Sequence, residues 1–261
     1  SGKFVRFADD VVAICGSYEE AQRLERCFER HCSESGLVIN RKKSPGIAVI
    51  SDYQHEIRTI NDFTYLGYGF SDKGLTLPKK TEQKLQEKVS RLINIYLINS
   101  LKHGFNTNRS NRQQGYDWDL LGLVYELRRG FYGGLKEKEI QDFLYDGARL
   151  AQMRGLMGFY CLIEDPSVLK SIDGWTVNMV RRASVKRNQI LDSRYGCECP
   201  TPSNHELILG SWINPSAWHG NTDADEKFEV PFPSLMRGWR AARKHFFTFG
   251  LEGVQAPGYD S

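Results

Sequence analysis

The chain has 261 residues, which is long enough for one large domain or two ordinary ones with a substantial core. A composition of 40% hydrophobic and 26% charged residues is typical of a globular protein, and no apolar run has the length of a membrane span. The net charge of +3 permits an anionic partner, and six scattered cysteines favour reduced thiols over a disulfide framework. We therefore predict a cytoplasmic protein without a membrane partner.

Residues 1–78 are predicted to form an α+β unit. Two short strands, Phe4 to Phe7 and Val11 to Cys15, flank a tight turn at residues 8–10. Ser17 followed three residues later by Glu20 is a capping box, and it predicts a helix that ends at Gly36. Further strands are expected over residues 37–40, 47–51 and 63–70.

After Pro78 the pattern becomes helical. Apolar residues recur at helical spacing over residues 85–96, 120–132, 140–160, 168–191 and 235–247. Residues 104–115 are polar and rich in turn formers, which predicts a loop. We therefore divide the chain into an α+β part (1–78), an all-α part (79–192) and an irregular C-terminal extension (193–261).

Asp9 and Asp10 stand side by side in the first turn, between two apolar strands. Adjacent carboxylates repel each other, and each resists burial. Magnesium ions neutralise such a pair through oxygen ligands, and two ions together support nucleotidyl transfer. A bare Asp-Asp pair is more often an exposed turn without a ligand, so its sequence context decides between these readings.

Three motifs occur here in a fixed order. An aromatic-Ala-Asp-Asp turn is followed by Val-Val-Ala-Ile; the segment Gly36 to Ser44 reads GLVINRKKS; and Tyr65-Leu66-Gly67-Tyr68 comes last. With the capped helix between the first two, this arrangement resembles the palm of bacterial reverse transcriptases of the group II intron, retron and phage-defence types. The resemblance implies a partial palm over residues 1–78 and a helical thumb over residues 79–192.

The resemblance also implies roles for the matched residues. Asp9 would be a direct metal ligand, and Asp10 would support or share the second of two Mg²⁺ ions. Phe7, which replaces a tyrosine common in the family, would lie with Ala8 near the primer terminus and the incoming nucleotide. The short hairpin formed by Tyr65, Leu66, Gly67 and Tyr68 would grip the primer.

Lys43 matches a lysine proposed in such polymerases to act near the leaving pyrophosphate as a general acid. The alternative is an ordinary solvated lysine in the basic run Arg41 to Lys43. The residue pattern leaves these two readings open.

The family also needs an aspartate from an earlier motif and fingers that hold template and nucleotide, and we recognise neither in this sequence. We therefore expect an N-terminal fingers and palm portion, in the same or a separate chain, as a partner. The resemblance then implies an RNA-directed DNA polymerase that uses dNTPs, an RNA template and a DNA or RNA primer. The absence of a recognisable appendage after the thumb favours a retron or phage-defence enzyme over an intron-encoded one.

Two other functions stay open. A related enzyme synthesises DNA without a template, or from a protein or noncoding RNA primer, with the same palm motifs. A non-catalytic subunit that binds nucleic acid is the alternative of another class. Self-association is also left open by the sequence.

Four basic residues at i, i+1, i+5 and i+6 give the fourth predicted helix a cationic side: Arg181, Arg182, Lys186 and Arg187. Clustered basic residues indicate a phosphate-binding face, and the alternative is a solvated helix face. Cys197 and Cys199 with His205 and His219 have poor spacing for a zinc site, so we predict none. The tryptophans of the extension are expected to pack or to meet a protein.

Overall fold

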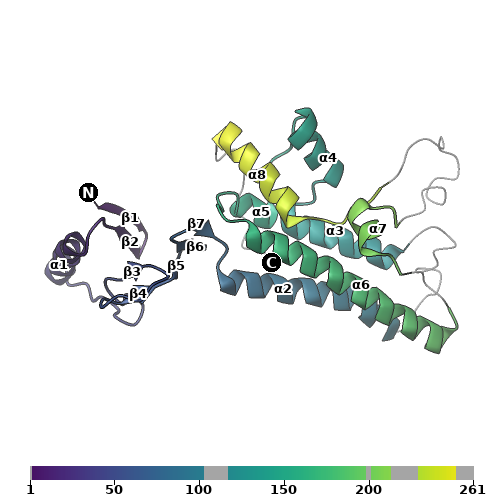
Figure 1. Cartoon of the computed structure of the whole chain (residues 1–261), viewed down its shortest axis with the longest axis horizontal. Coiled ribbons are helices and arrows are strands. Elements are labelled where there is room, and N and C mark those ends of the chain that lie inside the picture. The colour runs from purple at the N-terminus through teal and green to yellow at the C-terminus, as the bar shows by residue number, and fades with distance from the viewer. Residues whose placement is uncertain (1, 103–116, 198–200, 213–228, 251–261) are drawn as a thin grey trace. The chain divides into compact units, whose positions relative to one another are not determined.

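A computed structural model describes residues 2–102, 117–197, 201–212 and 229–250 (Figure 1). Helices and small sheets are mixed in the chain, which confirms the α+β class. Two compact units, Ser1–Pro78 and Lys79–Ser261, divide the chain. Among the described helices, none combines the length and the apolar character needed to cross a bilayer.

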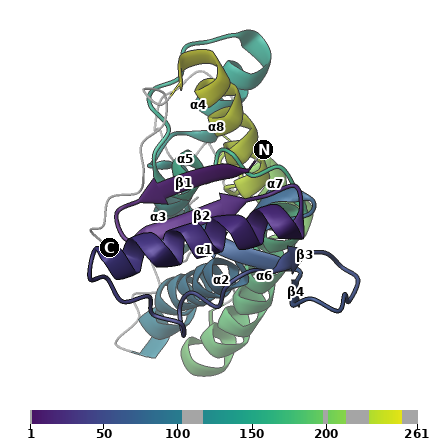
Figure 2. The same ribbon diagram turned by 90° about the vertical axis from the view of Figure 1, so that its left-hand side faces the viewer.

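The first unit opens with a hairpin and a helix (Figure 2). Strands β1 (Lys3–Phe7) and β2 (Asp10–Ile14) are antiparallel, and helix α1 (Tyr18–Glu34) follows them. The hydroxyl of Ser17 accepts from the backbone N–H of Glu20 at 3.2 Å, so the predicted N-cap is confirmed. The Glu20 carboxylate in turn accepts from the N–H groups of Gly2 and Gly16, which ties α1 to both ends of the hairpin.

The strand predicted over residues 37–40 is wrong. This segment pairs with no strand among the described residues, and Val38 is 94% exposed. An apolar run forms a strand only where a neighbour completes its hydrogen-bond ladder. The strand predicted over residues 47–51 is reduced to β3 (Val49–Ile50), which pairs in parallel with β4 (Thr59–Ile60).

A three-stranded antiparallel sheet ends the first unit. The predicted hairpin over residues 63–70 is confirmed as β5 (Asp62–Tyr65) and β6 (Tyr68–Ser71), and β7 (Gly74–Thr76) adds a strand that was not predicted. Phe63 and Phe70, paired across the hairpin, stack with ring centroids 5.0 Å apart. The unit buries few side chains beyond Cys32 and Leu77, so its interior is small.

The second unit is helical, as predicted. Helix α2 (Lys79–Ile93) continues as the π-turn η1 (Asn94–Ile98) and the 3₁₀ turn η2 (Asn99–Lys102). Helices α3 (Trp118–Tyr132) and α6 (Ser167–Tyr195) confirm two further predicted helices, and α2 packs along α6 (Figure 1). The predicted loop at 104–115 lies outside the described residues.

The long helix predicted over residues 140–160 is wrong. In its place are α4 (Glu137–Gln141), the π-turn η5 (Asp142–Asp146), an irregular segment and α5 (Gly155–Phe159). Gly147 and Gly155 take φ values of 70° and 69°, which interrupt a right-handed helix. A Cβ on Gly155 would lie 2.8 Å from the carbonyl oxygen of Gly130, so the chain crosses α3 closely there.

Residues 201–212 and 229–250 pack into the same unit. Helix α7 (Asn204–Leu209), which was not predicted, has a capping box between Ser203 and Glu206, and α8 (Leu235–Phe249) confirms the last predicted helix. The indole N–H of Trp212 donates to the Val230 carbonyl at 2.9 Å. The core of the unit includes the fully buried Leu97, Leu123, Tyr132, Ile140, Met157, Ile163 and Leu169.

Candidate functional site

The turn between β1 and β2 presents the two aspartates. Phe7 pairs with Asp10, so Ala8 and Asp9 form a two-residue loop. Ala8 takes a φ of 50°, a left-handed conformation that is uncommon for a residue with a Cβ. The Arg6 guanidinium donates to the Ala8 carbonyl at 2.9 Å and so braces the strained turn. Such strain costs about 1–3 kcal/mol and is concentrated at functional sites.

Both carboxylates at this turn are exposed, and no described hydrogen bond or ion pair reaches either of them. Asp9 and Asp10 therefore offer free oxygen donors, which is the chemistry that magnesium prefers. Within the described ranges, no three His, Cys, Asp or Glu side chains converge as a metal site would require. The aspartates fit part of a magnesium coordination shell and leave the remainder to water, substrate or a partner.

The second motif hairpin is joined to the first. Tyr65 pairs with Tyr68, which leaves Leu66 and Gly67 in a two-residue loop with φ values of 48° and 83°. These positive values are typical of a hairpin turn that fits twisted strands, although Leu66 carries a Cβ. The hydroxyl of Tyr65 donates to the backbone carbonyl of Asp10 at 3.4 Å. The structure thus brings two of the three sequence motifs together.

Lys43 lies in a turn built on Asn40. The N–H groups of Lys43 and Ser44 donate to the Asn40 carbonyl, at 3.0 and 2.8 Å. Neighbouring Arg41 forms ion pairs with Glu25 and Glu29 on α1, which anchors the segment. No described hydrogen bond or ion pair joins Lys43 to the Asp9–Asp10 turn, so its role near a pyrophosphate stays a prediction.

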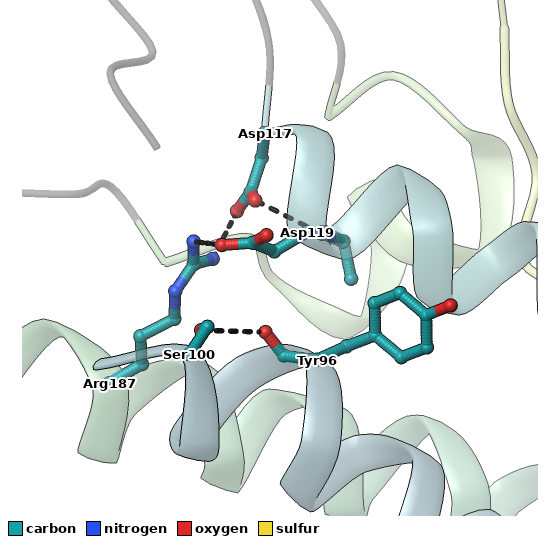
Figure 3. A network of polar contacts seen from close by, with 6 residues as sticks. Tyr96, Ser100, Asp117, Asp119 and Arg187 are labelled. Carbon is teal, nitrogen blue, oxygen red and sulfur yellow. Dashed lines mark hydrogen bonds and ion pairs between the residues drawn. The ribbon is translucent and has the colours of Figure 1, made fainter. Parts of the chain in front are cut away.

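Arg187 was predicted to contact phosphate, and this is wrong. Its side chain is 3% exposed and forms ion pairs with Asp117 at 2.6 Å and Asp119 at 3.0 Å (Figure 3). Asp117 also caps α3, because its other carboxylate oxygen accepts from the Leu120 N–H at 3.0 Å. The guanidinium therefore joins α6 to the start of α3 and is unavailable to a ligand.

The sequence contains the signal for this burial. The buried residues of α6 include Val180, Ser184, Arg187 and Leu191, which recur every three or four positions along one face. Arg187 lies on that face, whereas the basic-cluster argument placed it on the outer face. A helical wheel separates it from its three basic neighbours.

The three neighbours do form an exposed cationic face. Arg181, Arg182 and Lys186 are exposed and border a shallow hollow of about 750 Å³ on α6. The remaining described lining residues are uncharged: Asn178, Val185 and Gln189. Because no acidic side chain is among these lining residues, the face favours an anionic ligand.

A buried charge cluster where α3, α4, α6 and α8 meet was missed from the sequence. Glu137 pairs with Arg237, and burial raises the pKa of Glu137 to about 7, partly offset by Arg237 and Arg128. Asp173 accepts from the Ser234 hydroxyl and from the N–H groups of Leu235 and Met236, which holds the start of α8. Burial raises the pKa of Asp173 as well. These residues are scattered singly, and no motif marks them.

Cys199 and His219 of the dismissed zinc pattern lie outside the described residues, whereas Cys197 is a free thiol. Comparison of the chain with protein-family models, curated proteins and solved structures finds no match. The functional argument therefore rests on the motifs and their geometry.

Proposed function

We propose that this chain is the C-terminal palm and thumb of an RNA-directed DNA polymerase of the retron or phage-defence type. The observation that carries the proposal is the hydrogen bond from Tyr65 to the Asp10 carbonyl. It couples two short turns that the sequence motifs independently assign to metal binding and primer binding. Each turn holds a non-glycine residue at positive φ, Ala8 in one and Leu66 in the other.

In this function Asp9 and Asp10 would hold two Mg²⁺ ions together with an aspartate from the N-terminal palm. When bound, the ions would activate the primer hydroxyl and balance the charge on the leaving pyrophosphate. The protein would then contribute by positioning the two carboxylates relative to the reacting ends. The Arg6 brace and the Tyr65 hydroxyl hold the backbone on either side of the carboxylates, and Phe7 and Ala8 border the reacting ends.

The partner that we propose for the first unit is the N-terminal fingers and palm portion, in the same or a separate chain. Large apolar side chains on the β1–β2 hairpin are exposed, including Phe4 at 52% and Phe7 at 61%. The next motif adds Leu37 at 61% and Val38 at 94%. Further strands beside this hairpin would bury these side chains and complete the hydrogen-bond ladder of its open edges.

The helical unit would act as the thumb. Its exposed face of Arg181, Arg182 and Lys186 is suited to the phosphates of a template–primer duplex. RNA template, DNA or RNA primer and dNTPs are the expected ligands. We expect the enzyme to work in the cytoplasm.

Two alternatives remain. Template-independent synthesis, or synthesis from a protein or noncoding RNA primer, would use the same two hairpins. A non-catalytic nucleic-acid-binding subunit is favoured by the α6 face together with the lack of a third converging carboxylate among the described residues.

Primer extension by the assembled protein tests the proposal. We expect the full chain, combined with its N-terminal portion, to extend a primer on RNA in the presence of Mg²⁺. Asp9→Asn is expected to lower the rate by at least about 10³-fold, since each missing charge-stabilising group costs several kcal/mol in the transition state. Asp72→Asn, the same change at another exposed turn of the unit, is the matched control and should leave the rate unchanged. Full activity of the Asp9→Asn protein would refute the metal assignment.

A further inference from the structure

We propose that the outer face of α8 is a binding surface for single-stranded nucleic acid. The surface consists of Arg240, Arg243, Lys244 and Phe247. It belongs to the C-terminal part of the helical unit, and none of its residues takes part in the hairpins or the α6 face described above. The inference therefore goes beyond the proposed reaction and does not depend on it.

The opposite face of α8 already satisfies the packing needs of the helix. Its buried residues are Leu235, Gly238, Ala241, Ala242 and His245, which recur at helical spacing. A Cβ on Gly238 would lie 2.7 Å from the ring of Tyr132, so the inner face is in close contact with α3. Aromatic residues on the outer face are consequently not required for the core.

One ring on the outer face of the helix is largely exposed. Phe247 is 66% exposed, whereas Phe249 packs against the inner-face residue His245 with ring centroids 4.8 Å apart. The Arg243 guanidinium lies 5.2 Å from the ring centroid of Phe247 and 5.6 Å from that of Trp239. It also donates to the Ile163 carbonyl at 2.9 Å, which fixes its position. An arginine held in this way supports the Phe247 ring from one side and leaves part of that ring exposed to solvent.

The charge of the surface selects the class of ligand. The charged residues of α8 are Arg237, Arg240, Arg243 and Lys244, and the helix has no acidic residue. Arg240 and Lys244 are exposed, about two helical turns and about one helical turn before Phe247. Cations beside an exposed aromatic ring match a chain of phosphates that carries bases able to stack.

A neighbouring element extends the surface. The Lys244 ammonium group lies 4.8 Å from the Phe143 ring centroid and donates to the carbonyls of Phe143 and Leu144, at 2.7 and 3.1 Å. The next residue along η5 is Tyr145, whose ring is 72% exposed. Lys244 thus stands beside a second element that carries a free ring.

An unpaired strand fits this arrangement better than a duplex. Stacking on Phe247 requires a base whose π-face is accessible, and bases inside a duplex are covered by their neighbours. RNA and DNA single strands share this chemistry, so the experiment separates them by using both. If the surface bound a protein instead, neither single strand would bind.

Fluorescence anisotropy on the full chain tests the proposal. The probes are labelled oligo(U), oligo(dT) and a blunt DNA duplex, each about 15 nucleotides long, which is within the span of known single-strand surfaces. We expect at least one single strand to bind more tightly than the duplex. Phe247→Ala should weaken that binding about tenfold, and Phe247→Trp should retain it. Arg240→Gln should lower the slope of log affinity against log salt by about 1.

The controls keep the test independent of folding and of the polymerase proposal. Tyr53→Ala removes an 80% exposed ring from the first unit and should leave binding unchanged. Thermal melts confirm that each variant folds. Equal affinity of wild type and the Phe247→Ala variant, or no binding of either single strand, would overturn the inference; the latter would favour a protein partner. Asp9→Asn abolishes extension without changing this binding, so the two proposals fail separately.

Discussion

Replacing Arg187 with methionine removes a cation from a buried cluster. The Arg187→Met variant would leave Asp117 and Asp119 facing each other with side-chain exposures of 9% and 7% and no guanidinium between them. Removal of one partner from a buried ion pair costs about 3–5 kcal/mol, because the remaining charge is neither hydrated nor neutralised. The aliphatic part of methionine keeps most of the packing volume, so little of this loss comes from a cavity.

The cap of α3 is expected to suffer as well. Asp117 is held both by Arg187 and by the Leu120 N–H, and a carboxylate released from the arginine moves toward water. Loss of an N-cap costs about 1 kcal/mol, which places the expected destabilisation near the upper end of the range above. The first turn of α3 should then exchange its amide hydrogens faster.

Urea unfolding followed by tryptophan fluorescence measures the effect. All tryptophans lie after residue 78, so the signal reports the helical unit alone. We expect Arg187→Met to lower the unfolding free energy by about 5 kcal/mol. Arg181→Met, the same change on the exposed face of the same helix, should alter it by less than about 0.5 kcal/mol. A loss below about 1 kcal/mol for Arg187→Met would refute the buried-cluster argument.

Three further predictions concern other parts of the chain. The pKa of Glu137 is raised from 4.5 to about 7, so its contribution to stability is present below pH 4.5 and is lost as pH rises through 7. In urea titrations, the unfolding free energy of Glu137→Gln should rise by about 3 kcal/mol relative to that of wild type between those pH values. Parallel pH profiles of the two proteins would contradict this. Tyr65→Phe removes the bond to the Asp10 carbonyl and should slow primer extension about tenfold with a melting temperature close to wild type; an unchanged rate would show that the bond does not position the turn. Gly210 has a φ of 83°, and a Cβ there would lie 2.4 Å from the Val230 carbonyl carbon, so Gly210→Ala should lower the unfolding free energy by about 3 kcal/mol or more, whereas a neutral effect would argue against this close approach.

Local chemistry explains which elements were predictable. The β1–β2 hairpin and α1 follow from a two-residue turn between apolar runs and from the Ser17 N-cap, and both are confirmed. Turn geometry and end-capping involve residues a few positions apart, so the sequence shows them directly. Gly147 in the sequence indicated a break in the helix predicted over 140–160, but the apolar periodicity on either side of it favoured a continuous helix.

The α+β class, the change to helix after Pro78, the hairpin that carries Asp9 and Asp10, and most of the helices follow from the sequence. Three features required the folded chain: Arg187 is a buried partner of Asp117 and Asp119, Tyr65 meets Asp10, and residues 37–40 pair with no strand among the described residues. This difference comes from the range of the interactions. Helix caps and tight turns are satisfied within one or two turns of the chain, whereas burial of a charge depends on which distant element supplies its counter-ion.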